Sequence, residues 1–225
     1  MQLRALVTSG PTHEYIDPVR FLSNPSSGKQ GHAIASALAE KGFSVKLITG
    51  PTALEDPQGM TKIFHVKSAE EMLNAALGAL PVDVAICAAA VGDWYLPEIF
   101  SEKIKKTSAQ KTLNLTLERT ADILATISQH KNQRPNLVIG FAAETENLLE
   151  NAVKKRNEKK CDWILANLVS LENQAFQVDE NEILFISAEE NSTWMKQNKK
   201  AIAVELVEKI QQEFLKKNCN NIRVT

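Results

Sequence analysis

The chain has 225 residues, of which 44% are hydrophobic, so its length fits one large α/β domain or two small ones with a substantial core. It carries 26 Lys and Arg against 27 Asp and Glu, a formal net charge of −1. This balance excludes a global charge that would attract nucleic acid or an acidic membrane surface. Any anion site must therefore be local.

The three cysteines, Cys87, Cys161 and Cys219, are far apart and do not stand at metal-ligand spacing with a histidine. They predict a reducing compartment rather than a disulfide framework or a structural zinc site. No run approaches ~18 uninterrupted apolar residues, and the apolar part of the N-terminal "MQLRALVTSG" is too short for a signal peptide. We expect a soluble cytoplasmic protein that begins directly in its first strand.

Short β-rich apolar runs alternate with longer stretches of helical period along the chain. The expected strands are Leu3–Thr8, Ser44–Thr49, Lys62–Val66, Val82–Ala88, Asn136–Phe141, Asp162–Ala166 and Glu182–Ser187. The expected helices are 31–42, Ala69–Leu80, Ala121–His130, Glu146–Lys160 and Met195–Lys217. This alternation is typical of βαβ units. We predict a single domain over residues 1–225, an α/β Rossmann-like three-layer sandwich with a mainly parallel sheet and helices on both faces.

In the first expected helix, Ile34 and Leu38 recur at helical spacing and should face the sheet, and Gly42 stands where a glycine ends a helix. Two stretches, Val91–Lys111 and Val169–Glu182, show no clear period. In α/β folds the loops beyond the carboxyl ends of strands carry ligands, and the first stretch begins at such an end.

The segment "SNPSSGKQG", residues 23–31, leads from a long loop into a helix. It fails the Walker A pattern because Gln30 follows the Gly-Lys pair. Gly10 stands alone after the first strand, which disfavours a dinucleotide fingerprint, and neither tyrosine has the lysine that a short-chain dehydrogenase requires four residues later. Two readings stay open. The helix start binds an anion, or Ser26 or Ser27 only caps the helix.

Three later stretches place polar groups beyond expected strand ends. "AAAVGDW" brings small residues and Asp93, "EKIKK" is a local cationic cluster, and "GFAAET" brings Phe141 and Glu144 to an expected helix start. Each stretch also has a purely structural explanation. For "AAAVGDW" it is packing, for "EKIKK" a solvated charge run, and for "GFAAET" a core aromatic and a first-turn acid. Because the sequence offers no Ser-His-Asp triad or metal-ligand set, these residues favour electrostatic and positional catalysis on a phosphorylated substrate.

Taken in order, "TSGPT", "DPVRFLSNPSSGKQG", "AAAVGDW", "EKIKK", "GFAAET" and "CDWILAN" resemble phosphopantothenate–cysteine ligase of bacterial coenzyme A biosynthesis. In many bacteria that domain is fused to a flavin-dependent decarboxylase, so the chain resembles the stand-alone ligase or an excised domain. The resemblance implies that the carboxylate of 4'-phosphopantothenate attacks the α-phosphate of CTP and releases pyrophosphate. The amine of L-cysteine then displaces CMP from the acyl-cytidylate.

The resemblance also implies residue roles at the matching positions. Lys103 is the catalytic cation beside the α- and β-phosphates, and Asn24 holds the acyl-cytidylate for the second step. The implied nucleotide-binding residues are Cys87, Ala88, Ala89, Asp93, Lys103, Ala121, Asp122, Ile123, Leu124, Phe141, Lys155 and Lys159. The implied substrate-binding residues are Gly10, Arg20, Asn24, Ser26, Ser27, Gly28 and Ala90.

The family's Asn-Pro-Asp-Ile run is Thr-Ala-Asp-Ile here, which keeps Asp122 and loses the proline turn. The resemblance further implies Mg²⁺, with its ligands undefined, and a homodimer to which Val169–Ser187 could supply a strand or flap. A separate phosphopantothenoylcysteine decarboxylase is a candidate partner, whereas nucleic acid and membrane are not expected. Two alternatives remain: the ATP-dependent version of the same ligase, and a non-catalytic nucleotide-binding module on a Rossmann-like sheet.

Overall fold

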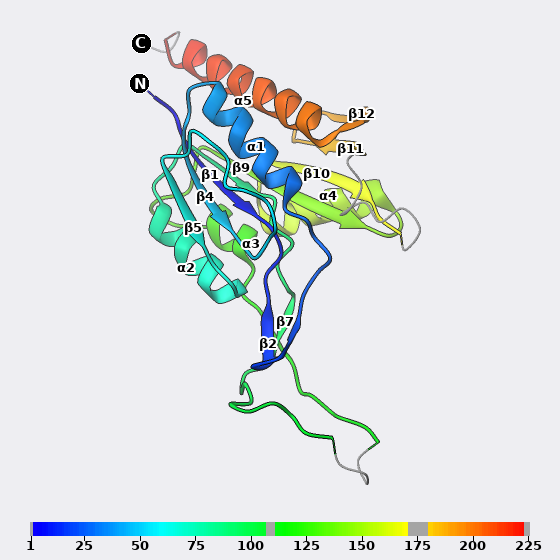
Figure 1. Cartoon of the computed structure of the whole chain (residues 1–225). Coiled ribbons are helices and arrows are strands. Elements are labelled where there is room, and N and C mark those ends of the chain that lie inside the picture. The colour runs from blue at the N-terminus through cyan, green and yellow to red at the C-terminus, as the bar shows by residue number, and fades with distance from the viewer. Residues whose placement is uncertain (1, 107–110, 171–179, 223–225) are drawn as a thin grey trace.

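The computed structural model describes residues 2–106, 111–170 and 180–222. Its centre is an eight-stranded sheet with the order β12-β11-β10-β9-β6-β1-β4-β5 (Figure 1). The strands span Arg4–Ser9 (β1), Ser44–Thr49 (β4), Lys62–His65 (β5), Val84–Cys87 (β6), Leu137–Glu144 (β9), Trp163–Leu168 (β10), Glu180–Ile186 (β11) and Asn191–Asn198 (β12). The ladders from β10 to β5 are parallel, and β11 and β12 pair antiparallel.

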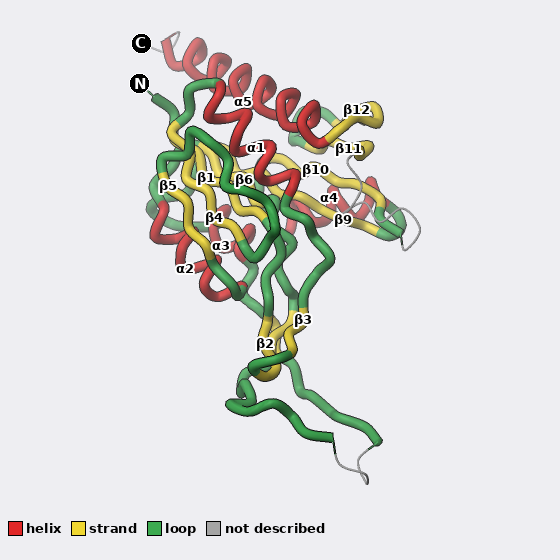
Figure 2. Tube along the Cα trace, in the orientation of Figure 1, coloured by secondary structure: helices red, strands yellow, loops and turns green. Residues whose placement is uncertain are grey.

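Helices cover both faces of this sheet, which gives three layers (Figure 2). One face carries α1 (Lys29–Glu40) and α5 (Lys199–Ile222), and the other carries α2 (Ala69–Ala79), α3 (Ile123–Ser128) and α4 (Leu148–Lys159). The predicted Rossmann-like α/β sandwich is confirmed. Over the described residues, no helix is long and apolar enough to cross a membrane.

The parallel strands are apolar throughout because both of their faces are buried. On β1, Ala5 and Val7 join the core under α1 and α5, whereas Leu6 joins the core on the opposite face. Ile34 and Leu38 of α1 are fully buried against the sheet, as predicted. The sheet core therefore fixes both the position and the rotation of α1.

The sheet has a switch point between β1 and β6. From β1 the chain passes through α1 to β4 on one side, and it later returns to β6 on the other side. Loops that leave neighbouring strands in opposite directions open a crevice at the carboxyl ends of those strands. The predicted ligand loops follow these two strands.

The segment predicted as one helix, Met195–Lys217, is divided, so its predicted start is wrong. Its first residues belong to the edge strand β12, and α5 begins only at Lys199. Trp194 of β12 is buried and stacks on Phe185 of β11, with ring centroids 5.6 Å apart. Pairing with β11 holds this segment extended. The apolar pattern within the segment could not predict this pairing, because it depends on a contact with another strand.

An arm projects from the body of the molecule, formed by residues 14–22, 94–106 and 111–119 (Figures 1 and 2). Two short antiparallel ladders support it where it leaves the body. They are β2 (Glu14–Asp17) with β3 (Arg20–Leu22), and β7 (Trp94–Tyr95) with β8 (Glu118–Arg119). The sequence predicted only aperiodic loops here, because strands of two to four residues are too short to show a period.

Candidate active site

A cavity of about 880 Å³ lies at the carboxyl ends of the parallel strands. Residues of β1, β6, β9 and β10 line it, together with the starts of α1 and α3. The lining extends from Thr8 to Lys199, so segments remote in the sequence meet there. This is the position where parallel α/β sheets bind ligands.

The loop before α1 brings Ser26, Ser27 and Gly28 to the cavity. Gly28, with a φ of 77°, is the N-cap residue of α1 and has no side chain to offer as a cap. The reading in which a serine caps this helix is therefore wrong; Ser26 Oγ instead accepts the Gly28 N–H at 3.3 Å. The start of α1 lines the cavity from Gly28 to Gly31, where helix N–H groups favour an anion.

Ser9, Gly31 and His32 hold the start of α1 against the end of β1. A Cβ on Gly31 would lie 2.4 Å from Ser9 Oγ, so only glycine permits this approach. Ser9 Oγ donates to the Gly28 carbonyl at 2.9 Å and lies 2.9 Å from His32 Nδ1. Burial lowers the pKa of His32, so this ring supports the loop in its neutral form.

Small residues after β6 form the floor of the cavity. Cys87, Ala88, Ala89 and Ala90 line it in succession, which leaves room for a flat group at the strand end. Burial raises the pKa of Cys87 to about 12, which keeps its thiol protonated at neutral pH. Asp93 follows this floor at the exposed rim.

Asn24 connects the loop before α1 to the floor. Its Nδ2 donates to the carbonyl oxygens of Ala90 at 3.3 Å and Val91 at 3.1 Å. These two bonds engage the amide nitrogen, so Oδ1 is the acceptor that the carboxamide presents to a ligand.

The opposite wall comes from β9, α3 and α4. Phe141 is half-buried; it packs against the core and lines the cavity. Asp122 accepts a backbone N–H of α3 at 2.8 Å as its N-cap and pairs with Lys159, while Lys155 Nζ lies 3.3 Å from Glu144 Oε1. The expected helix-start position of Glu144 is wrong, because the ladder between β9 and β10 continues to this residue.

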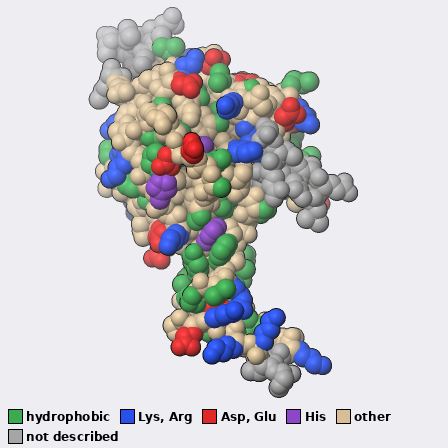
Figure 3. Space-filling model, viewed as in Figure 1, with side chains coloured by type: hydrophobic (Ala, Val, Ile, Leu, Met, Phe, Trp, Pro, Cys, Tyr) green, Lys and Arg blue, Asp and Glu red, His purple; other side chains and the backbone are tan. Residues whose placement is uncertain are grey.

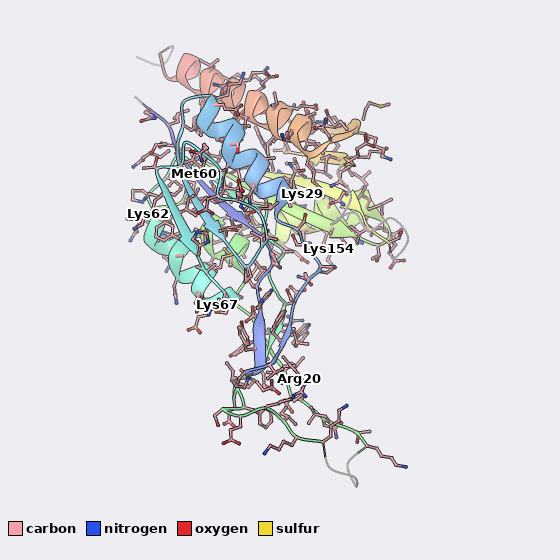
Figure 4. All side chains as sticks on the ribbon, in the orientation of Figure 1. Arg20, Lys29, Met60, Lys62, Lys67 and Lys154 are labelled. Carbon is pink, nitrogen blue, oxygen red and sulfur yellow. The ribbon has the colours of Figure 1, made fainter. Side chains whose placement is uncertain are left out.

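The cavity gathers most of the predicted site residues. Those on its lining are Asn24, Ser26, Ser27, Gly28, Cys87, Ala88, Ala89, Ala90, Asp93, Ala121, Asp122, Ile123, Leu124, Phe141, Lys155 and Lys159. Three predicted residues lie off the lining. Gly10, with a φ of 75°, packs behind Gly28, whereas Arg20 and the exposed Lys103 belong to the arm. Figure 4 shows Arg20 on the arm, well away from Lys29 at the start of α1.

A buried carboxylate, Asp17, fixes the chain next to Lys103. Its side chain is fully buried and pairs with Arg20. It also accepts the N–H groups of Val19 at 2.7 Å and Ile104 at 3.1 Å. Burial opposes ionisation of Asp17, but the hydrogen bonds from Val19, Ile104 and Arg20 outweigh it and hold its pKa below the usual value.

Sequence reasoning missed a polar group at the α1 end of the cavity. Its members are Lys29, Gln30, Asn167, Asn181 and Lys199. Lys29, Gln30 and Asn167 stand in motifs that the sequence marked, but no role was assigned to them there, and no local signal marks Asn181 or Lys199. They meet only because α1 packs on α5 and β10 pairs with β11.

The fold and the cavity together define a Rossmann-like α/β protein with a ligand site at its strand ends. That site combines a helix N-terminus, a floor of small residues and several cations. The chain belongs to the family described as the DNA/pantothenate metabolism flavoprotein C-terminal domain, which matches residues 1–214.

Two kinds of relatives support this assignment. The coenzyme A biosynthesis bifunctional protein CoaBC of Vibrio vulnificus is 38% identical over 207 residues, covering 92% of this chain and 51% of the relative. The chain thus spans about half the length of the curated relatives it matches. The crystal structure of a CoaBC C-terminal domain is 37% identical, with a TM-score of 0.78 and coverage of 96% of this chain and 98% of that chain.

A third similarity concerns the fold alone. A Cab2 mutant in complex with phosphopantothenate-cysteine has a TM-score of 0.76 at 17% identity, covering 97% of this chain and 88% of that chain.

We predict that Asp17→Asn loosens the arm at Ile104, since a neutral amide accepts backbone N–H groups more weakly than a carboxylate. Hydrogen exchange of the Ile104 amide should be faster in this variant at neutral pH. The pKa of Asp17 is lower in the folded protein than in the unfolded chain. The stabilisation of the arm by the ionised carboxylate is therefore fully present above the pKa of the unfolded chain, and it is lost as pH falls through the pKa of the folded protein. Protection of Ile104 in the unmodified protein should therefore disappear at acidic pH.

Asp162→Asn is the matched control for this measurement. Asp162 also pairs with an arginine, Arg134, and accepts the Val138 N–H at 2.7 Å, but it lies in the body of the molecule. The control should leave exchange in the arm unchanged. Equal exchange of Ile104 in the Asp17→Asn variant and the unmodified protein would show that the carboxylate does not hold the arm.

Proposed function

We propose that the protein ligates 4'-phosphopantothenate to L-cysteine with CTP through an acyl-cytidylate, and releases 4'-phosphopantothenoylcysteine, CMP and pyrophosphate. The observation that carries this proposal is the convergence of dispersed motifs in one cavity. The resemblance assigns roles to Asn24, Asp93, Asp122 and Phe141, and these come from four separate segments that line the same space. The 37% identical CoaBC domain, matched over nearly its whole length, supports the same conclusion.

The nucleoside is proposed to bind between the floor and the α3–α4 wall. Ala88 and Ala89 are small enough for a base to approach the strand end, and Phe141 offers an aromatic face. Asp93 at the rim can accept from a base amine or a ribose hydroxyl. The pairing of Lys159 with Asp122 balances charge at this wall, which suits an uncharged nucleoside better than a polyphosphate.

Asn24 is proposed to act in the second step, when cysteine attacks the acyl group. Its amide nitrogen is engaged by two carbonyls, so its Oδ1 can accept a hydrogen bond from the incoming amine. That interaction would orient the amine for attack while CMP leaves. Alignment of the two reactants supplies catalysis without a protein nucleophile.

Lys103 lies on the arm and not on the cavity lining. Its proposed role in catalysis therefore needs an arrangement that brings the arm to a cavity. Apolar side chains gather along the arm and cations at its tip (Figure 3). The exposed apolar side chains of the arm are Val19, Phe21, Trp94, Ile99, Phe100 and Leu113. Exposed apolar side chains gathered on one projecting segment favour association. We propose a homodimer in which the arm packs on a second copy and delivers Lys103 to the cavity of that copy.

Mg²⁺ is proposed to enter with the nucleotide. Within the described segments, no three His, Cys, Asp or Glu side chains converge in a way that could hold a metal ion. Magnesium commonly binds through phosphate oxygens and water with few protein carboxylates, so an ion that enters with the nucleotide needs no such cluster. When bound, it would screen the negative charge of the triphosphate.

The first experiment measures pyrophosphate release by the full chain with CTP or ATP, with 4'-phosphopantothenate present or omitted. We expect release with CTP that depends on 4'-phosphopantothenate, because its carboxylate is the attacking group. Preference for ATP would select the ATP-dependent ligase. Nucleotide binding without any release would select the non-catalytic module and reject the ligase. A decarboxylase on another chain, or in the rest of a longer protein, would act on the ligation product.

We predict that two variants separate the two steps. Lys103→Ala should slow pyrophosphate release, since it removes the cation beside the reacting phosphates. The expected loss of transition-state stabilisation is about 3 kcal/mol. Asn24→Ala should retain that release and slow capture of the acyl-cytidylate by cysteine. Lys154→Ala is the control, because Lys154 is exposed on α4 and off the cavity lining. Parallel loss of both steps in the Asn24 variant would make Asn24 a binding or folding residue.

The proposed exchange of arms predicts complementation between inactive chains. A mixed dimer of one Lys103→Ala chain and one Asn24→Ala chain would contain one cavity with both residues intact. Statistical mixing of the two variants should therefore restore roughly a quarter of the unmodified ligation rate. Refolded mixtures are compared with each variant alone in a full ligation assay. Mixtures as inactive as the separate variants would place both residues in the site of a single copy.

A further inference from the structure

Arg119, in the short strand β8, is a cation on the cavity lining to which no role has been assigned. Its guanidinium carbon lies 5.6 Å from the ring centroid of Trp94, its partner across the β7–β8 ladder. The face of the ring restrains the guanidinium, and the N–H groups at its edge can still donate to a ligand. Arg119 is exposed, and among the described residues it forms no ion pair, including with Asp93 on the same lining.

The alternation of side chains along β7 and β8 keeps Arg119 apart from the acid next to it in the chain. Successive residues of a strand point to opposite faces. Trp94 and Arg119 both line the cavity. Tyr95 and Glu118 lie off the lining, where the Tyr95 hydroxyl donates to Glu118 Oε2 at 3.3 Å. The ladder therefore presents its cation to the cavity and its acid elsewhere.

A short stretch of backbone connects Arg119 to Asn24. Asn24 Nδ2 donates to the Val91 carbonyl at 3.1 Å, and Trp94, three residues later, pairs with Arg119. Thr120 fastens the same stretch, because its Oγ1 donates to the next backbone carbonyl after Val91 at 2.6 Å. Three residues of extended chain span about 10 Å. Asn24 and Arg119 therefore approach the cavity from the two ends of one short stretch.

The ligand that meets Asn24 in the proposed second step is L-cysteine. Its amine must come within about 3–3.5 Å of the acyl carbon, and its carboxylate is attached to the same carbon atom as the amine. The carboxylate therefore enters this part of the cavity together with the amine. A planar guanidinium binds a carboxylate through two parallel hydrogen bonds, which fix its orientation as well as its position.

We propose that Arg119 binds the carboxylate of L-cysteine and so selects the amino acid over amines that lack this group. The inference rests on the proposed function and deepens it by naming the residue that recognises the amine substrate. Such a pair would also orient the amine toward the acyl group. The phosphate oxygens of 4'-phosphopantothenate and CTP offer Arg119 similar chemistry, so the experiment must distinguish the three ligands.

The test compares L-cysteine with cysteamine, which has the same amine and thiol but no carboxylate, in ligation by the full chain and its Arg119→Gln variant. In the variant, kcat/KM for L-cysteine should fall at least about tenfold, because a charge-assisted pair is lost. The kcat/KM for cysteamine should be retained, as should the KM values for CTP and 4'-phosphopantothenate. An unchanged preference for L-cysteine over cysteamine would overturn the proposal. A raised KM for either phosphorylated substrate would overturn it too and assign Arg119 to a phosphate.

Two further variants test whether the effect is specific. Lys131→Gln removes an exposed cation that lies off the cavity lining, and the preference for L-cysteine should persist. Arg119→Lys keeps the positive charge without the planar fork and should restore part of the preference that Arg119→Gln loses. No restoration would overturn the proposal.

The same assays separate this inference from the proposed function. Ligation by the unmodified chain, with an unchanged preference in Arg119→Gln, would reject the role of Arg119 and leave the ligase assignment intact. Failure of the unmodified chain to ligate either amine would reject the proposed function, and the inference that rests on it would fall as well.

Discussion

The approach of α1 to the end of β1 is the constraint on which the cavity depends. It requires Gly31, because any Cβ there would collide with Ser9, and it is fixed by the hydrogen bond from Ser9 to the Gly28 carbonyl. The contact directs the first N–H groups of α1 toward the crevice at the switch point. The start of α1 also lies beside the start of α5, where Gln30 donates to the Lys199 carbonyl at 3.1 Å.

The charged side chains differ between the two ends of the cavity. The wall formed by α3 and α4 pairs its lysines with Asp122 and Glu144, so its charges are largely balanced. The end formed by α1 and α5 presents Lys29, Lys199 and helix N–H groups. The two ends of the cavity therefore differ in charge, and they would distinguish the uncharged from the charged part of a bound ligand.

The arm carries Lys103, the proposed catalytic lysine, away from the cavity. Its conformation is specified by the buried Asp17, which holds Arg20 and the backbone of Ile104. A fully buried carboxylate with these partners maintains a defined geometry for the chain beside Lys103. A structured arm with exposed apolar surface fits delivery of that lysine to a second molecule better than a loose loop would.

The sequence by itself determined the layers of the fold, since periods of apolar residues report which faces of α1 and of the parallel strands are buried. It also marked Asn24, Asp93 and Phe141 through motifs that are local in the chain. Only the tertiary structure decided that Asn191–Asn198 is a strand, that Lys103 stands apart and that Lys199 joins the cavity. These features depend on strand pairing and on helices packed across long sequence separations. Such contacts leave no periodic trace in the segments that make them.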